Sequence, residues 1–282
     1  MRIRNAGIRA IVVIVGFVGA STASAAEWFS QDFMNPYDET FILDLGGILN
    51  QFDTSLRLDG TATGGRGTDI NLENNGLKKN LSSFEAGAMW RLYQRHRVQL
   101  DYYSVQRSGS RTFESDISIG GNDYPIGATV GITNKYQLFA ADYRYSFIQR
   151  PEYELAALVG AYGGKITFDV SAVGNAGHLT ADYNKSSSTT LPLPTLGLSW
   201  DWYPTRQVQV SALAAGMKAK ISDVDGRVGL FSLDGNYMLS RNFGLGLRYS
   251  YVDIRADVTK DSFNGNFRWR ANSVSAYARL AF

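Results

Sequence analysis

The sequence holds few residues that could carry catalysis, and its histidines are the first to consider. The chain has no cysteine and only two histidines, His96 and His178, so a thiol nucleophile is excluded and the usual general base is scarce. His96 lies in the polar turn Gln94-Arg95-His96-Arg97, where a solvated side chain is expected. His178 lies in a glycine-containing loop close to the serines at 186–188, and a hydrolase would have to depend on it.

One short segment places oxygen ligands at alternate positions, Asp69-x-Asn71-x-Glu73. Calcium loops space their ligands in this way, but this segment lacks the glycine and the distal bidentate glutamate of the full motif. The glycine-rich run over 60–67 lacks the Lys-Ser/Thr ending of a phosphate loop. We therefore expect a solvated acidic loop, no metal site and no cofactor.

The first 25 residues have the composition of a secretory signal peptide. Three arginines within the first nine residues precede the apolar run 10–20, and Ala23-Ser24-Ala25 supplies small residues at a cleavage site. The apolar run is shorter than the roughly 20 residues that a spanning helix needs. We expect cleavage after Ala25, a periplasmic segment over 26–39 and one domain over 40–282.

The charge balance gives no reason to expect a nucleic-acid partner. The chain has 28 basic and 26 acidic residues, and loss of the three leading arginines would leave 25 against 26. Export without any cysteine favours a bacterial envelope over a eukaryotic secreted domain, which commonly relies on disulfides.

The remainder of the chain alternates between apolar and polar residues, the pattern of strands with two different faces. In one segment, for example, Phe84, Ala86, Ala88 and Trp90 share a face that Glu85, Gly87, Met89 and Arg91 oppose. The pattern predicts an all-β fold with ten strands over 40–58, 81–93, 97–119, 125–148, 153–171, 190–203, 207–222, 227–239, 243–258 and 265–282.

Short polar joints alternate with joints that are often longer along the chain. An even number of strands with short turns at one end predicts a single antiparallel transmembrane β-barrel of about ten strands. Eight strands remain possible if one hairpin lies wholly above the membrane. Asp225-Gly226 and Asn264-Gly265 predict two-residue hairpin turns. Aromatic residues gather beside the short joints, where an interfacial girdle is expected.

The last strand carries a resemblance to a known class. Its ending, Tyr277-Ala278-Arg279-Leu280-Ala281-Phe282, resembles the assembly signal of Gram-negative outer-membrane β-barrel proteins, with Tyr277, Leu280 and Phe282 at the signal positions. In size and loop style the chain is similar to the small OmpA-, OmpX- and OmpW-like barrels and to the ten-stranded omptins. The resemblance implies a place in the outer membrane, contact with its lipid and lipopolysaccharide, and assembly by the barrel-assembly machinery.

The polar face of the expected strands is heavily charged. Charges inside a barrel of this size must be paired or hydrated, so we expect a structural network in the lumen, with a narrow water or ion path as the alternative. The expected network comprises Asp44, Glu85, Arg91, Asp101, Asp142, Arg144, Glu154, Asp201, Asp234, Arg248 and Arg279.

In several strands the apolar face changes phase part-way along, often beside a glycine such as Gly46-Gly47 or Gly216. We favour glycine-marked β-bulges, which would keep the same outer face apolar. The alternative is an apolar outer half of the lumen, which would resemble the hydrophobic channel of the OmpW-like barrels. That pocket would be lined by Phe52, Ile166, Phe168, Met217 and Ile254.

These observations predict a non-enzymatic, porin-like outer-membrane barrel that either stabilises the envelope or binds or passes a small hydrophobic ligand. The alternative is a hydrolase acting on lipid A or peptides at the extracellular rim. Its candidate site is weak, because His178-x-Thr180 departs from the His-x-Ser motif of small-barrel lipid-A deacylases and no rim strand carries a His-Asp pair.

Overall fold

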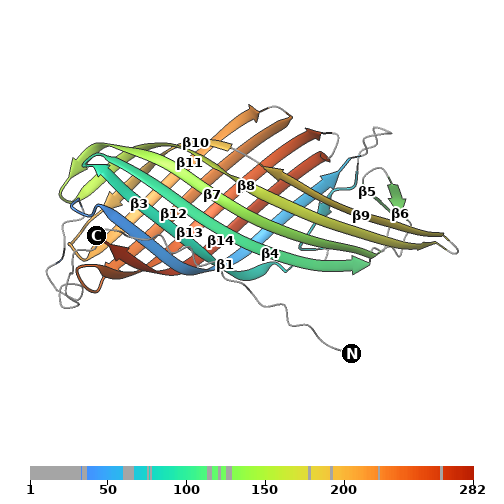
Figure 1. Cartoon of the computed structure of the whole chain (residues 1–282), viewed down its shortest axis with the longest axis horizontal. Coiled ribbons are helices and arrows are strands. Elements are labelled where there is room, and N and C mark those ends of the chain that lie inside the picture. Colours follow the sequence, from blue (N-terminus) through green and yellow to red (C-terminus); the bar gives the residue numbers. More distant parts are fainter. Residues whose placement is uncertain are drawn as a thin grey trace, which may run out of the picture.

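Ten long antiparallel strands close into a barrel (Figure 1). The computed structural model describes residues 33, 37–59, 67–74, 76, 78–112, 116–119, 122–124, 129–176, 179–190, 193–221, 223–260 and 263–282. The ten strands of the ring are β1 (Phe41–Leu58), β3 (Asn80–Tyr93), β4 (His96–Thr112), β7 (Thr129–Arg150), β8 (Tyr153–Ala176), β10 (Leu193–Trp202), β11 (Val208–Ile221), β12 (Val224–Met238), β13 (Phe243–Lys260) and β14 (Phe263–Ala281). The ring closes where β1 pairs with β14, so the prediction of a ten-stranded barrel is confirmed and the eight-stranded alternative is wrong. Among the described residues, no helix is long and apolar enough to cross a membrane.

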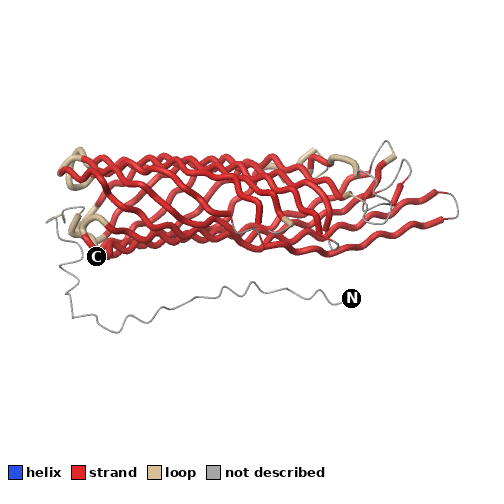
Figure 2. The backbone as a smooth tube through the Cα atoms, turned by 90° about the horizontal axis from the view of Figure 1, so that it is seen from above, coloured by secondary structure: helices blue, strands red, loops and turns tan. Residues whose placement is uncertain are grey.

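The two ends of the barrel differ. Four connections, 94–95, 151–152, 203–207 and 239–242, lie at the end that also carries Phe282, and we call it the turn end (Figure 2). At the opposite or distal end, β9 (Leu179–Thr190) continues the line of β10 and pairs with the far part of β8. The expected signal peptide, residues 1–25, lies outside the described residues.

Three distal details differ from the sequence-based expectations. Residues 173–176 and 179–189, which lie between two predicted strands and were expected in a loop, belong to β8 and β9, whose backbones pair with each other. Asp225-Gly226 lies within β12, since the hairpin closes at the pair Ile221↔Val224. Asn264-Gly265 likewise lies within β14, since Lys260 pairs with Phe263. Short additional strands are β2 (Ile70–Asn71), β5 (Ile117–Ile119) and β6 (Asn122–Tyr124).

The two faces of each strand exchange character along the barrel, and β1 shows how. Near the turn end Leu45 points outward and Asp44 is buried inside, whereas further along Phe52 is 1% exposed and Asp53 lies on the outer face. The register runs without a shift through Gly46↔Tyr277 and Gly47↔Ala276. The bulge explanation is therefore wrong for this strand, and the pairs that flank Gly163-Gly164 and Gly216 are equally continuous.

The exchange follows from the length of the strands relative to the membrane. A strand of 18 residues such as β1 extends about 60 Å, or about 45 Å along the axis of a barrel with the usual tilt. The apolar band of an outer-membrane barrel is only about 25 Å tall. The distal half therefore extends beyond the lipid into water, where polar residues face outward and apolar residues form a core.

The apolar core fills the distal half of the lumen. Its buried residues come from most of the ring and from the connection between β1 and β3, which supplies Ile70 and Leu72. The members contributed by the strands are Phe52, Leu56, Val105, Tyr136, Leu138, Leu193, Val228, Ile254, Ala256, Val258, Phe267, Trp269 and Ala271. We call the half of the lumen on the turn-end side the inner half, and it carries most of the buried charged side chains. The two halves meet near the middle of the barrel.

Candidate functional site

A compact ion-pair cluster closes the lumen at the turn end. Glu154 is fully buried and accepts hydrogen bonds from both terminal nitrogens of Arg91, each at 3.3 Å. Arg97 lies between Glu154 at 3.6 Å and Asp201 at 2.8 Å. Every charge in this cluster meets an opposite charge, which is the condition for keeping ions in a lumen of low dielectric.

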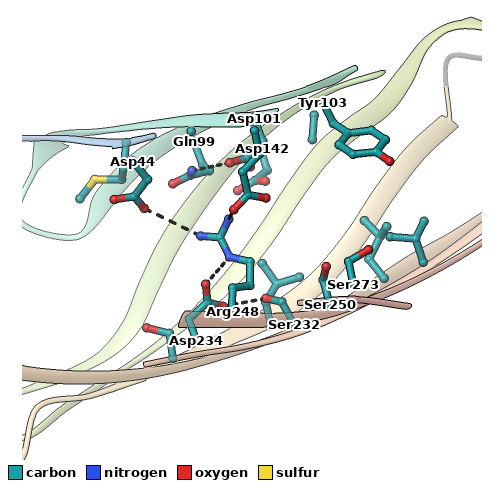
Figure 3. A pocket seen from close by; sticks show the side chains of 18 of the residues that line it. Asp44, Gln99, Asp101, Tyr103, Asp142, Ser232, Asp234, Arg248, Ser250 and Ser273 are labelled. Atoms are coloured by element: carbon teal, nitrogen blue, oxygen red, sulfur yellow. Dashed lines mark hydrogen bonds and ion pairs between the residues drawn. The ribbon is translucent and has the colours of Figure 1, made fainter. Parts of the chain in front are cut away.

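A second cluster surrounds Arg248 in the middle of the barrel (Figure 3). The Arg248 guanidinium forms ion pairs with Asp234, with Glu85 at 3.7 Å and with Asp44 at 3.8 Å. Arg279 binds both carboxylate oxygens of Asp44, at 2.9 and 2.8 Å. The ring of Tyr277 lies against both guanidinium groups, 4.9 Å from that of Arg248, which adds a cation–π contact.

A latch between a loop residue and the barrel closes the distal side. Arg107 is almost fully buried and donates to the Glu73 carboxylate at 2.5 Å and to the Thr54 hydroxyl at 2.7 Å. The Thr54 backbone N–H also donates to Glu73, at 2.7 Å. Arg107 further donates to the Tyr136 hydroxyl at 3.1 Å, and burial raises the pKa of Tyr136 to about 12. The latch holds Leu72, which has no exposed surface, over the apolar core.

A cavity of about 250 Å³ lies in the lumen between these closures. Its inner wall carries the charged groups around Arg248, and its distal wall carries aromatic and aliphatic side chains (Figure 3). The residues of the distal wall are Tyr103, Leu138, Tyr162, Leu230, Val252 and Trp269. Ligand sites commonly combine apolar walls with a few placed polar groups and begin at about 300 Å³, so the cavity suits a small molecule.

Several polar atoms in the cavity wall have no partner of their own. The indole N–H of Trp269, the hydroxyl of Ser199 and the side-chain amide of Asn236 make no hydrogen bond among the described residues. All three side chains are buried, with Trp269 only 2% exposed. Because these atoms have almost no accessible surface, they are a free-energy cost of the buried wall and not contacts that the cavity offers to a ligand.

The structure places all eleven charged residues predicted for the lumen on the inward faces of their strands. Nine of them line the cavity, while Arg91 and Glu154 lie beyond it toward the turn end. Sequence reasoning missed two arginines of the same face. Arg97 was placed at the start of a predicted strand but not among the lumen charges, and Arg107 was not considered, although both share the face of Gln99 and Asp101 on β4.

The structure places the residues predicted for an apolar pocket in different surroundings. Phe52 and Ile254 are buried in the distal core. Met217 pairs with Val228 in register and therefore lies on the same face. It is nevertheless 40% exposed, because the pairing of β10 with β11 ends at Leu196↔Gly216 and leaves Met217 uncovered. Its assignment to an enclosed pocket is therefore wrong. The side chains of Ile166 and Phe168 lie outside the described part of the structure.

The residues of the expected assembly signal take three different positions. Tyr277 points into the lumen, and Leu280 lies on the outer face as the partner of Phe243. Phe282 is 40% exposed at the turn end, with its ring 6.4 Å from that of Phe41. The backbone N–H of Phe282 donates to the Phe41 carbonyl at 2.8 Å, which fixes the end of the chain to the first strand.

The other motifs hold structural positions. His96 begins β4 and packs against the rings of Tyr93 and Tyr145. His178 lies outside the described residues. The expectation of a solvated acidic loop is wrong for Glu73, whose carboxylate is only 6% exposed because it holds the latch. No group of three His, Cys, Asp or Glu residues suited to a metal ion occurs within the described ranges.

No family model and no curated protein sequence matches the chain. Among solved structures it is similar to the outer-membrane protease OmpT from Escherichia coli, with a TM-score of 0.56 and 11% identity over 93% of this chain and 100% of that one. It also matches Ail of Yersinia pestis (TM-score 0.28, 13% identity, 85% and 98% covered) and the toluene transporter TodX of Pseudomonas putida (TM-score 0.35, 8% identity, 86% and 89% covered).

The chain is an outer-membrane β-barrel protein. The closed ten-stranded ring and the apolar outer band define the class, and the likeness to OmpT supports the fold. At this level of identity the likeness concerns the fold alone, so the function has to come from the lumen itself.

Proposed function

We propose that this barrel is a non-enzymatic binding protein that holds one small molecule with an apolar body in its lumen cavity. The observation that carries the proposal is a lumen cavity of about 250 Å³ between an ion-pair cluster and an apolar core. Passage of solutes is the less favoured alternative, since Arg97 and Asp201 on one side and Arg107 on the other fill the lumen with buried side chains.

The walls of the cavity define the kind of molecule that fits. Leu230 and Val252 face Leu138 and Tyr162 across a space too narrow for a large ligand. The carboxylates and guanidinium groups of the inner wall supply polar contacts at one edge of that space. A compact molecule with one or two polar groups would meet that edge and bury its apolar body against the distal wall.

We also propose that the outer surface contacts lipopolysaccharide. Lys135 and Lys165 are exposed on the outer face of β7 and β8, just beyond the apolar band that ends at Phe139 and Ala161. Ammonium groups at the distal edge of the apolar band would be placed to pair with lipid phosphates. Replacement of both lysines with glutamine should weaken co-purification of lipopolysaccharide, and an unchanged amount of bound lipid would contradict this contact.

A matched pair of alanines provides the test of cavity binding. Ala140 lines the cavity, whereas its neighbour Ala141 is exposed on the lipid-facing side of the same strand. Ala140→Leu should fill the cavity and abolish binding of 3,3-dimethyl-1-butanol, measured by calorimetry and by the fluorescence of Trp269. Ala141→Leu should bind like the wild-type protein. Equal binding by both variants, with folding verified by heat-modifiable gel migration, would contradict the proposal.

A further inference from the structure

We infer that the cavity selects a small organic ammonium ion, with its cationic group beside Asp101 and its far end at Trp269. This inference rests on the proposed function, because it names the chemical class of the ligand held in the same cavity. Three observations carry it: an excess of negative charge, one carboxylate without an ion pair, and aromatic side chains in the wall of the same cavity.

The charges that line the cavity do not balance. Six carboxylates face it, from Asp44, Glu85, Asp101, Asp142, Asp201 and Asp234. Only four guanidinium groups face it, from Arg97, Arg144, Arg248 and Arg279. Beyond the cavity Arg91 and Glu154 add one charge of each sign, so the excess of two negative charges remains. A low-dielectric lumen favours a cation that compensates such an excess.

The excess is concentrated at Asp101. Arg144 forms an ion pair with Asp142 at 2.6 Å. Arg248 forms ion pairs with three other carboxylates, those of Asp44, Glu85 and Asp234. Within the described part of the chain, Asp101 makes no ion pair within 4 Å and accepts one hydrogen bond, from the Gln99 side-chain amide at 2.9 Å, while the charge of Arg248 acts on it from a longer distance. Its carboxylate therefore keeps the capacity to bind a cation from the cavity.

The neighbours of Asp101 in the sheet leave its carboxylate uncovered. Asp101 pairs with Gly87 on β3 and with Ala140 on β7, and neither residue has a side chain long enough to reach over it. A Cβ atom at Gly87 would lie 2.7 Å from the nearer Asp101 oxygen, so a larger residue there would displace the carboxylate. These two small residues open the space in which a ligand can reach Asp101.

Aromatic rings surround the same space. Tyr162 follows Ala140 in the row of paired residues that starts at Asp101. Tyr103 lies two positions from Asp101 along β4, on the same face (Figure 3). Trp269 lines the cavity from β14. Rings of this kind attract alkylammonium ions through cation–π contacts, which strengthen when water is excluded.

The surroundings favour an ammonium ion over a metal ion. A hard metal ion takes about six oxygen ligands, whereas no set of three ligating side chains is suitably placed among the described residues. The apolar contacts from Leu138, Leu230 and Val252 suit alkyl groups instead.

Choline and 3,3-dimethyl-1-butanol provide the test, because they share their shape and hydroxyl group and differ in charge. The full-length barrel is titrated with each in a maltoside detergent, which contains no ammonium group. We expect choline to bind at least about tenfold more tightly than the neutral alcohol, as the loss of a buried charge contact implies. Asp101→Asn should remove that difference, while Asp253→Asn, on the outer face, should preserve it.

The two proposals fail in different ways. Equal affinity for both probes, or a preference for choline that survives in Asp101→Asn, would overturn the ammonium assignment and leave cavity binding intact. Binding of neither probe to the wild-type barrel would overturn both. If Asp101→Asn does not fold, Tyr162→Leu replaces it: choline affinity should fall while the affinity for the alcohol is kept, and Tyr162→Phe should restore choline binding. Unchanged choline affinity in Tyr162→Leu would overturn the assignment.

Discussion

At the scale of single residues, the lumen is held by charges that each need a particular partner. Glu154 is the clearest case, because two arginines depend on one carboxylate that water does not reach. Replacing such a group removes more than its own contacts, since Arg91 stays buried without its carboxylate partner and Arg97 keeps only Asp201. The stability of the inner half should therefore be sensitive to this position.

Glu154→Gln should lower the free energy of unfolding by about 3–5 kcal/mol, the usual effect of breaking a buried ion pair from one side. The measurement is urea unfolding of the refolded barrel in micelles, followed by tryptophan fluorescence. Glu152→Gln serves as the control, because Glu152 is exposed in the turn before β8 and should change stability little. Similar losses in the two variants would contradict the role of the cluster.

Glu39 should make stability depend on pH near neutrality. Burial raises the pKa of Glu39 to about 7, against the opposing effect of Arg279 and Arg91, and Asp44 adds to the rise. Between the unfolded and folded pKa values the folded chain keeps a proton that the unfolded chain has lost. Folding should therefore be favoured at pH 5 and weakened as pH rises through 7.

The comparison of unfolding free energies at pH 5 and pH 8 tests this effect. Glu39→Gln should show a smaller loss between the two pH values than the wild-type barrel. Asp38→Asn, at the exposed neighbouring position, should show the same loss as wild type. An unaltered pH profile in Glu39→Gln would exclude this residue as the cause.

At the scale of elements, alternation predicted the strands because neighbouring residues of a strand face two different surroundings, both inside and beyond the membrane. The bounds of β1, β3 and β11 agree with the prediction to within one residue. The strand β9 (Leu179–Thr190) was not predicted, since its sequence lacks an apolar alternation and it is held by backbone pairing with β8. The hairpin dipeptides were misleading because pairing of the flanking strands, rather than local turn preference, decided where each hairpin closed.

The phase change on β1 marks where the strand leaves the lipid, and two outward positions test it. Leu49 is 67% exposed within the apolar band, and Ser55 points outward beyond it. Leu49→Arg should cost about 2–4 kcal/mol for folding into lipid vesicles, because a charge faces hydrocarbon. Ser55→Arg should cost almost nothing. Comparable costs at both positions would show that the distal half does not extend beyond the membrane.

At the scale of the whole molecule, two environments explain a composition that looks ordinary. Inside the membrane the barrel is apolar outside and charged inside, and in its distal half the arrangement is reversed. The sequence predicted the barrel and the inward charges, because both follow from alternation. It could not separate bulges from a distal core, since the phase change looks the same until the register between strands is known.

The cavity belongs to the same scale, because it forms where the two halves meet. No segment of the sequence marks it: Asp101, Ala140, Tyr162 and Trp269 come from four different strands. Only closure of the ring brings them around one space. We assign binding, and not passage of solutes, to the lumen, because buried side chains fill the lumen on both sides of this cavity.

The most direct test locates a ligand inside the barrel. Crystals grown with 2-bromoethyltrimethylammonium, at a concentration that saturates the Trp269 fluorescence change, should show anomalous scattering from bromine in the lumen. We predict a peak between Asp101 and Trp269 in the wild-type protein and none there in Ala140→Leu. A lumen without bromine, or a peak confined to the outer surface, would contradict the claim that this barrel holds a small molecule in its cavity.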